Sequence, residues 1–308
     1  MNILYKSASE RGDLWADLLA QLAPDASFRQ WPDIGDSASI DYLVAWQPPE
    51  EILQQFPNLK VLFSVGAGAD QFDYSRLPPE LPVVRMIEPG LTQGMVEYVT
   101  FAVLGLHRNM PRYLHQQRQQ LWLGHGSKPA AHCRVGVMGV GELGEAALAP
   151  LVQLGFDCAG WSRSAKAIPG VSSFVGDAEL GAFLARSDIL ICLLPLTPAT
   201  EGILNASLFS QLPPGASLVQ VGRGKHLHHQ HLLDALESGQ LLAAVIDVSS
   251  PEPLPQDHPF WTHPAIWLTP HIASQTQPES AVRALLENIR RFERGETMIG
   301  LVDRSRGY

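Results

Sequence analysis

The sequence predicts an α/β protein built from two doubly wound parallel-sheet domains. Its 308 residues are more than one hydrophobic core usually serves, so two domains are the first expectation. Short apolar runs alternate with helical patterns along most of the chain, an order typical of βαβ units and parallel sheets. A second alternating series begins at Arg134, after a long helical stretch. Each series is therefore expected to form its own sheet.

The first series predicts strands separated by helical segments. Strands are expected at residues 3–6, 42–46, 60–65 and 83–87, and helices at 14–22 and 50–56. A long helical stretch follows, over about residues 92–122, and its first half is apolar on more than one face. A helix that is apolar all round has to be buried, either in its own protomer or in a subunit interface.

The second series repeats the alternation and ends in one more helix. Strands are expected at residues 135–138, 158–161, 189–193, 217–221, 243–247 and 266–268, with helices at 142–154, 231–238 and 279–294. These elements predict one domain formed by residues 1–98 plus 275–308, and a second domain, residues 99–274, inserted between its two parts.

Charge and cysteine content argue against several classes of partner. The net charge is −9, with no Lys/Arg run longer than two residues, so neither nucleic acid nor an anionic membrane surface is expected as a partner. The N-terminus lacks a signal-peptide pattern, and no apolar run is long enough to span a membrane. Cys133, Cys158 and Cys192 are far apart and are expected to be buried free thiols in the cytoplasm rather than a disulfide or metal site.

A glycine pattern follows the first strand of the second series. Gly139, Gly141 and Gly144 fit G-x-G-x-x-G between an apolar strand and a helix that opens at Glu142-Leu143. The first glycine permits the tight turn, the second lets a pyrophosphate approach, and the third lets helix and strand pack closely. The motif predicts a dinucleotide at this helix N-terminus, and a βα turn without a ligand is the alternative.

The end of the next strand indicates which dinucleotide binds. NAD sites usually place an acidic residue there, but this chain has Ser162, Arg163 and Ser164, with Lys166 beyond. A nearby arginine suits a 2′-phosphate, and without a carboxylate there is no like-charge repulsion. We therefore expect NADPH to be preferred and NADH to be a poorer cofactor. The alternative is that Arg163 is an ordinary solvated residue.

Polar side chains follow three later strands of the same series. Arg223 lies between two glycines after one strand, Asp247 ends the next with Glu252 beyond it, and His271 follows the last. Carboxyl ends of parallel strands share one edge of a sheet, where such folds bind ligands, so these groups are expected to converge. Each has an ordinary alternative: a strand-capping or paired arginine, a loop acid, a satisfied histidine. Their joint occurrence favours a site.

The ordered motifs resemble the D-isomer-specific 2-hydroxyacid dehydrogenase family over nearly the whole chain. The matching segments are residues 65–70, 139–144, 194–197 with Thr200, 221–224, 247–248, Glu252 and 270–271. The resemblance implies a flavodoxin-like substrate domain, a Rossmann cofactor domain, and a homodimer formed through the long helical stretch. Segments 138–144 and 160–164 most resemble members that reduce glyoxylate and hydroxypyruvate, so a small 2-keto acid of this kind is the expected substrate.

The resemblance also implies roles for individual residues. Arg223 would bind the substrate carboxylate and polarise the keto oxygen, and His271 would donate a proton as hydride arrives. Glu252 would hydrogen-bond the far side of that imidazole and favour its charged form. Asp247 would hold the nicotinamide carboxamide. Further cofactor contacts are expected from Leu194, Pro195, Leu196, Thr200, Val221, Gly222, His271 and Ala273.

The first domain is expected to complete the substrate site. The resemblance implies that backbone N–H groups near Gly66 and Ala67 grip the substrate carboxylate, with Trp46 or Met95 closing the pocket. The chain departs from the family at Gln220, where Asn is common, and at Glu97-Tyr98, where a Glu-His pair is common. Both departures bear on subgroup specificity rather than on reaction type.

Other interpretations remain open at this point. A protein of the same fold could sense NAD(P) as a corepressor without turnover, but an intact Arg223, Glu252 and His271 weigh against it. Phosphoglycerate dehydrogenase is a weaker alternative, because the sequence has no recognisable regulatory domain. The histidines His226, His228, His229 and His231 suggest a metal site, but a solvated helix face is favoured and no metal is expected.

Overall fold

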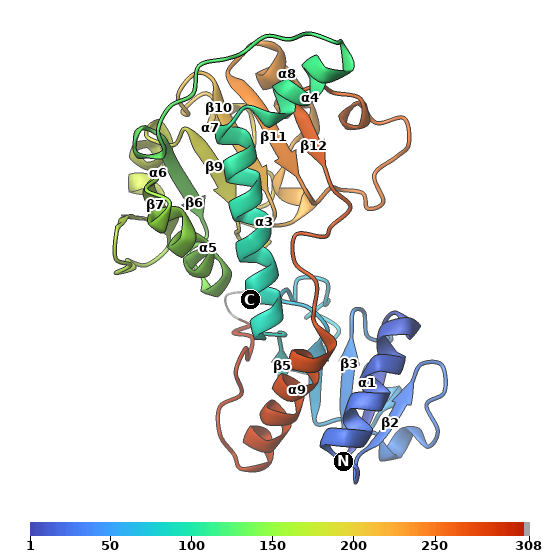
Figure 1. The fold of residues 1–308 in the computed structure, drawn as a ribbon. Coiled ribbons are helices and arrows are strands. Elements are labelled where there is room, and N and C mark those ends of the chain that lie inside the picture. The colour runs from blue at the N-terminus through green and yellow to red at the C-terminus, as the bar shows by residue number, and fades with distance from the viewer. Residues whose placement is uncertain (305–308) are drawn as a thin grey trace. The chain divides into compact units, whose positions relative to one another are not determined.

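The computed structural model describes residues 1–304 and divides into two compact units, each with its own parallel sheet (Figure 1). Unit 1 comprises Met1–Thr92 together with the C-terminal segment from Gln275, and unit 2 comprises Gln93–Ser274. The sequence placed the first boundary at residue 98, but the boundary lies earlier, between Thr92 and Gln93. The reason is that Met95 and Val99 already pack in the core of unit 2. The predicted fold class, two parallel-sheet α/β domains, is confirmed.

The sheet of unit 1 has the strand order β2-β1-β3-β4-β5, with all neighbours parallel. Its strands are β1 (Asn2–Lys6), β2 (Ser27–Gln30), β3 (Tyr42–Ala45), β4 (Val61–Ser64) and β5 (Val83–Val84). This order is that of flavodoxin-like sheets. β3 and β4 are buried along their whole length, as expected for central strands covered on both faces.

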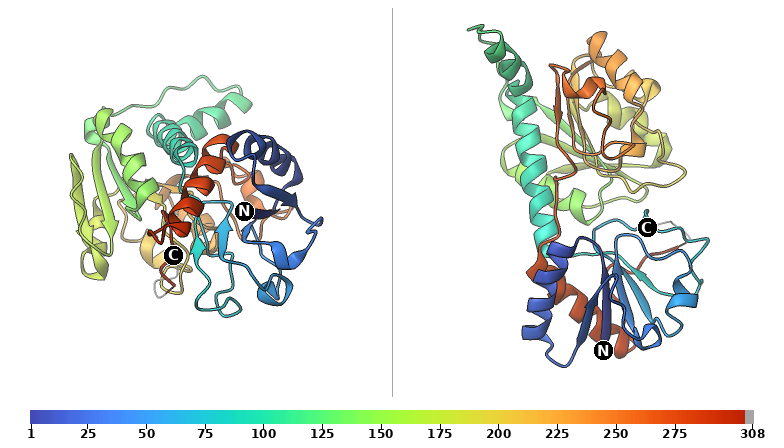
Figure 2. Two further views of the ribbon diagram at one scale, coloured as in Figure 1. Left: turned by 90° about the horizontal axis from the view of Figure 1, so that it is seen from below. Right: turned by 90° about the vertical axis from the view of Figure 1, so that its right-hand side faces the viewer.

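Helices from both ends of the chain cover one face of this sheet. α1 (Ser9–Leu22) and α9 (Pro278–Glu293) lie side by side in both views of Figure 2. Trp15 of α1 and Leu285 and Ile289 of α9 are buried in the same hydrophobic cluster. The short α2 (Ile52–Gln55) and the 3₁₀ turn η1 (Ser37–Ser39) complete the unit. Its core therefore depends on a segment that follows unit 2 in the sequence.

The sheet of unit 2 has the strand order β12-β11-β10-β9-β6-β7-β8, again all parallel. Its strands are β6 (Arg134–Met138), β7 (Asp157–Ser162), β8 (Val171–Val175), β9 (Ile189–Cys192), β10 (Ala216–Gln220), β11 (Leu241–Ile246) and β12 (Ile266–Leu268). The order reverses at β6, between β7 and β9. This is the Rossmann topology, in which ligands bind beyond the carboxyl ends of the strands at that switch point.

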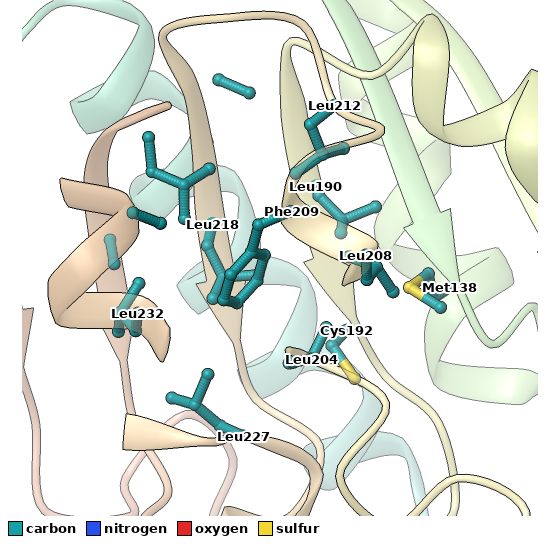
Figure 3. Close-up of a cluster of buried hydrophobic side chains, with 14 of the residues drawn as sticks. Met138, Leu190, Cys192, Leu204, Leu208, Phe209, Leu212, Leu218, Leu227 and Leu232 are labelled. Carbon is teal, nitrogen blue, oxygen red and sulfur yellow. The ribbon is translucent and has the colours of Figure 1, made fainter. Parts of the chain in front are cut away.

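Helices cover both faces of this sheet. α3 (Pro89–His107) and α5 (Glu142–Gln153) bury one apolar cluster, and α6 (Gly176–Ala185), α7 (Ala206–Phe209) and α8 (His229–Glu237) bury another (Figure 3). The remaining elements are α4 (Met110–Arg118) and the 3₁₀ turns η2 (Ala130–His132), η3 (Gly224–His226) and η4 (Pro259–Trp261). Both faces of the β6–β9–β10 region are therefore closed, which leaves the carboxyl ends of the strands as the place for a site.

The long helix expected over residues 92–122 is in fact two helices, so this prediction was wrong. α3 ends at His107, and α4 begins after Asn109, which has a left-handed backbone with φ of 56°. Asparagine adopts that conformation more readily than most residues. The prediction that α3 is apolar on more than one face holds, because Val99 and Val103 are buried while Phe101 is 62% exposed.

Candidate active site

The glycine turn between β6 and α5 has the geometry that its sequence predicts. Gly139 has φ of 97°, and a Cβ there would lie 2.6 Å from the carbonyl oxygen of Leu193. A Cβ on Gly144 would collide with the carbonyl of Gly139, so helix and turn pack closely only without a side chain. Both positions exclude any larger residue.

Gly141 differs from the other two glycines because the space around it is open. No heavy atom of the described residues lies within 4 Å of a Cβ placed there. Gly141 is also the N-cap of α5, and among residues 1–304 no side chain caps that helix end. The first amides of α5, at Glu142 and Leu143, are therefore available to an anion, and the helix dipole favours one. This end of α5 fits a pyrophosphate.

The strand beside β6 ends in the polar segment predicted to select the cofactor. β7 ends at Ser162, whose hydroxyl donates to the carbonyl of Ser164 over 2.7 Å. Arg163 and Ser164 follow and are exposed, as is Lys166. Because β7 is the parallel neighbour of β6, its carboxyl end lies next to the glycine turn. A bound dinucleotide would extend toward this segment.

The loop after β9 is held in shape by one threonine. The hydroxyl of Thr200 donates to the carbonyl of Pro195 over 2.7 Å and accepts the N–H of Thr197 over 2.9 Å. Leu194 is buried. The loop, residues 193–200, therefore has a defined conformation at the switch point, consistent with the cofactor contacts predicted for Leu194, Pro195, Leu196 and Thr200.

The conformation of the loop that carries Arg223 is fixed by the last residue of β10. Gln220 is fully buried, and its side-chain amide donates to the carbonyl of Arg223 over 2.8 Å and accepts the N–H of Gly222 over 3.2 Å. A Cβ on Gly224 would collide with the backbone of Ser249. Gly224 therefore allows the loop after β11, which carries Glu252, to lie directly against the Arg223 loop.

Glu252 and His271 form a hydrogen-bonded pair. Oε2 of Glu252 lies 2.9 Å from Nδ1 of His271, and both side chains are 38% exposed. The other carboxylate oxygen accepts the N–H of Ser249 over 2.8 Å. The bond to Glu252 raises the pKa of His271 above 6.5, although burial and the charge of Arg223 oppose the rise. Burial favours a higher pKa for Glu252, but His271, Ser249 and Arg223 together lower it. The pair therefore favours imidazolium and carboxylate.

Asp247 organises the loop that presents His271. Its buried carboxylate accepts the hydroxyl of Thr269 over 2.6 Å and the N–H groups of Ile272 and Ala273 over 2.8 and 2.9 Å. Its backbone carbonyl accepts the N–H of His271 over 2.8 Å. These bonds hold His271 in a left-handed backbone with φ of 55°, which is costly for a residue with a side chain and persists only where its surroundings enforce it.

The structure thus brings the predicted catalytic trio together within unit 2. Arg223, Glu252 and His271 follow the carboxyl ends of β10, β11 and β12, and the charge of Arg223 influences the pKa of both others. The residues predicted to complete the substrate site belong to unit 1, where the hydroxyl of Ser64 accepts the N–H of Gly66 over 3.2 Å. Gly66 and Ala67 are half-buried and Trp46 is exposed. Met95, the alternative to Trp46, is buried in the core of unit 2.

Four residues that shape the site were not predicted from the sequence to belong to it. Gln220 was noted only as a departure from the family, and His226 only within a histidine cluster. Tyr98 and Thr269 form a chain with Asp247, in which the hydroxyls of Tyr98 and Thr269 lie 2.5 Å apart and Thr269 donates to the carboxylate. For Gln220, Thr269 and Tyr98 the available signal was a polar residue at a strand end or inside an apolar run, where burial demands a hydrogen-bond partner. For His226 the sequence offered no such signal.

The histidine cluster does not lie on a solvated helix face as predicted. His226 is fully buried, and only His228 is exposed. Nδ1 of His229 lies 3.0 Å from Nε2 of His258. The difference arises because His226 precedes α8 and belongs to η3, so helical spacing does not apply to it. Within residues 1–304 no group of three or more His, Cys, Asp or Glu side chains is arranged to hold a metal ion.

The prediction that the three cysteines are buried and free is confirmed. Cys133, Cys158 and Cys192 are free and buried, and burial raises their pKa to about 11, 12 and 12 respectively. Over the described residues, no helix has the length and apolar character that crossing a membrane requires.

The fold and the site together define a class of protein. A sequence profile of the D-isomer specific 2-hydroxyacid dehydrogenase NAD-binding domain matches residues 100–273. The chain belongs to the D-isomer specific 2-hydroxyacid dehydrogenase family, which confirms the resemblance.

Particular relatives are similar over their full length. The chain is 42% identical to glyoxylate/hydroxypyruvate reductase A of Yersinia enterocolitica and 41% identical to that of Serratia proteamaculans, with 100% of each chain covered in both cases. Among solved structures, it resembles a family member from Xanthobacter autotrophicus in complex with NADPH and MES (39% identity, TM-score 0.95, 100% and 99% covered). It also resembles the NADPH-dependent glyoxylate/hydroxypyruvate reductase of Sinorhizobium meliloti in complex with NADP and sulfate (34% identity, TM-score 0.91, 100% and 99% covered).

Proposed function

We propose that the protein is an NADPH-preferring reductase that converts small 2-keto acids, glyoxylate and hydroxypyruvate among them, to 2-hydroxy acids. The observation that carries the proposal is the Glu252–His271 pair at 2.9 Å beside Arg223, with the pKa of His271 raised. A proton donor and a fixed cation at one sheet edge are what reduction of a keto acid requires. The relatives of known name support the same substrate class.

The residues of the chain divide the work on the substrate. The guanidinium of Arg223 binds the substrate carboxylate and draws electron density toward the keto oxygen. His271 donates a proton to that oxygen from Nε2, because its Nδ1 is bonded to Glu252. Glu252 keeps the imidazole charged and oriented.

The cofactor is NADPH, which supplies hydride to the keto carbon when bound. The uncapped first turn of α5, with Gly139, Gly141 and Gly144, binds the pyrophosphate. Ser162, Arg163 and Ser164 bind the 2′-phosphate. Further contacts come from the β9 loop, from Val221 and Gly222, and from the loop that Asp247 organises, including Ala273. Solved relatives in complex with NADPH and NADP support this choice.

The test is NADPH oxidation with a panel of 2-keto acids: glyoxylate, hydroxypyruvate, pyruvate and phosphohydroxypyruvate. The proposal expects turnover of the first two, with NADPH used more efficiently than NADH. NADPH binding without turnover of any member would instead identify a cofactor sensor. Preference for phosphohydroxypyruvate would identify a phosphoglycerate dehydrogenase.

We also propose that the protein is a cytoplasmic homodimer that associates through α3, α4 and the segment after them. Phe101 on α3 is 62% exposed and stacks on Trp267, and Leu121, Trp122 and Leu123 are exposed beyond α4. Exposed apolar residues in this number mark an interaction surface. Analytical ultracentrifugation should give a dimer for the wild type and a monomer for Phe101→Glu. Leu14→Glu, at an apolar position in α1 that is 53% exposed, should leave the dimer intact.

A further inference from the structure

A buried histidine beside Arg223 takes no part in the proposed reaction. His226 is fully buried at the end of η3, whereas its neighbours Lys225 and His228 are exposed. Removing an imidazole from water is costly unless its polar atoms find partners in the protein. The partners of the two ring nitrogens therefore indicate what this residue does.

The two ring nitrogens of His226 have partners of opposite kinds. The backbone N–H of Arg223 donates to Nδ1 over 3.0 Å, so Nδ1 carries no proton. Nε2 lies 3.3 Å from the carbonyl oxygen of Pro195, which can only accept, so Nε2 carries the proton. The ring is therefore neutral, because a second proton, on Nδ1, would point directly at the N–H of Arg223.

The backbone around His226 leaves room for an imidazole at this position. A Cβ on Gly222 would lie 2.9 Å from Nδ1, so a larger residue there would push the ring out of line with Arg223. The thiol of Cys192 lies 3.9 Å from the same nitrogen. Cys192 and Leu227 belong to the buried cluster of Figure 3. The ring is thus held by packing as well as by hydrogen bonds.

We propose that His226 is a positioning residue that connects the cofactor loop to the loop that carries the substrate arginine. Pro195 belongs to the first loop and Arg223 to the second, and one imidazole is hydrogen-bonded to the backbone of both. The inference rests on the proposed function, which assigns Arg223 to the substrate and residues 194–200 to NADPH. Nδ1 therefore positions the loop that binds the substrate, and Nε2 positions the loop that binds NADPH.

Two substitutions separate the two hydrogen bonds. In His226→Asn, the side-chain oxygen replaces Nδ1 as acceptor for Arg223, but the donor to Pro195 is lost. In His226→Gln, the side-chain amide replaces Nε2 as donor to Pro195, but the acceptor is lost. The exposed His228 offers a matched control, His228→Asn, which should leave both ligands unaffected.

The readouts are two binding constants, measured by fluorescence: the Kd of NADPH, and the Kd of oxamate for the NADPH complex. Oxamate is an amide analogue of glyoxylate and reports on Arg223 without turnover. His226→Asn should weaken NADPH binding by about fivefold, the value of one hydrogen bond, and leave oxamate within about twofold. His226→Gln should do the reverse. Loss of stability alone would not produce opposite patterns in the two variants.

Any other pattern overturns the proposal: both constants unchanged, both weakened in parallel in each variant, or the pattern exchanged. A wild type that binds both ligands but reduces no keto acid would overturn the proposed function, and the binding pattern would still decide the role of His226. Should either variant fail to fold, neutron diffraction of the wild type supplies the test. Deuterium is expected on Nε2 of His226 alone, and deuterium on Nδ1 would refute the inference.

Discussion

Replacing Glu252 with Gln removes one negative charge beside His271 while keeping an oxygen that can accept from Nδ1. In the native pair these atoms are 2.9 Å apart, and the hydrogen bond to Glu252 is the largest cause of the raised pKa of His271. Burial and Arg223 both act to lower that pKa and are unchanged by the substitution. The variant therefore isolates the contribution of the carboxylate charge.

The size of the effect follows from the exposure of the pair. Hydrogen bonds to charged groups contribute about 1.5–3 kcal/mol when buried, whereas exposed ion pairs contribute about 0–1 kcal/mol. Both side chains are 38% exposed, so solvent screening reduces the interaction to about 1 kcal/mol. The pKa of His271 should therefore fall in Glu252→Gln, because the imidazolium loses the interaction with the carboxylate charge.

The sign is fixed by the role of His271 as proton donor. Reduction requires imidazolium, so kcat/KM is high below the pKa of His271 and falls as the pH rises through it. A lower pKa in Glu252→Gln moves this fall to lower pH. The assay is NADPH oxidation with glyoxylate as a function of pH, from about 5.5 to 9.

Glu279→Gln provides the control for this experiment. Glu279 is an exposed acid on α9 that pairs with Arg283, and its substitution should leave the pH profile unchanged. A Glu252→Gln profile that coincides with the wild type, or moves to higher pH, would refute the assignment of His271 and Glu252 as proton donor and partner.

Three further predictions address the rest of the site. Arg223→Ala should lower kcat/KM for glyoxylate by at least about a thousandfold and change the Kd of NADPH by less than about twofold, and turnover near the wild-type rate would exclude its role. Ser162→Asp combined with Arg163→Ala should shift the NADPH-to-NADH ratio of kcat/KM toward NADH by at least about tenfold; an unchanged ratio would place discrimination elsewhere. Gly141→Ala should weaken NADPH binding without lowering the unfolding temperature. Gly224→Ala, whose Cβ would collide with Ser249, should instead destabilise the protein by about 1–3 kcal/mol. Equal effects of the two substitutions on stability would contradict this contrast.

The central strands of both sheets could be predicted because burial on both faces makes them continuous apolar runs. β3, β4 and β9 are buried at every position, and each had been predicted within a residue or two. β2 and β8 were missed because they are edge strands. Neither SFRQ nor VSSFV contains a fully buried residue, and both mix exposed with partly buried positions. The sequence of so short a strand does not distinguish it from a loop.

The site residues that could be predicted are those whose chemistry is visible in the residue itself. Arg223 beside glycines and His271 after a strand stand out as charged or titratable groups in an apolar context. The hydrogen-bond partners of the supporting groups could not be predicted, because Gln220 and His226 bind backbone atoms whose positions depend on the completed fold. The break at Asn109 was missed for a similar reason, since asparagine is also found inside helices.

The discontinuity of unit 1 affects the order in which the protein can fold as it is synthesised. Residues 1–92 leave the ribosome first, yet their core includes Val282, Leu285 and Ile289 of α9. Buried Glu88 likewise accepts hydrogen bonds from Gln277 and Ser280 as well as from the first turn of α3. Unit 2 is contiguous and can fold while the chain is still growing. Unit 1 must wait for α9, so during translation its apolar strands are the part of the chain most in need of protection from aggregation.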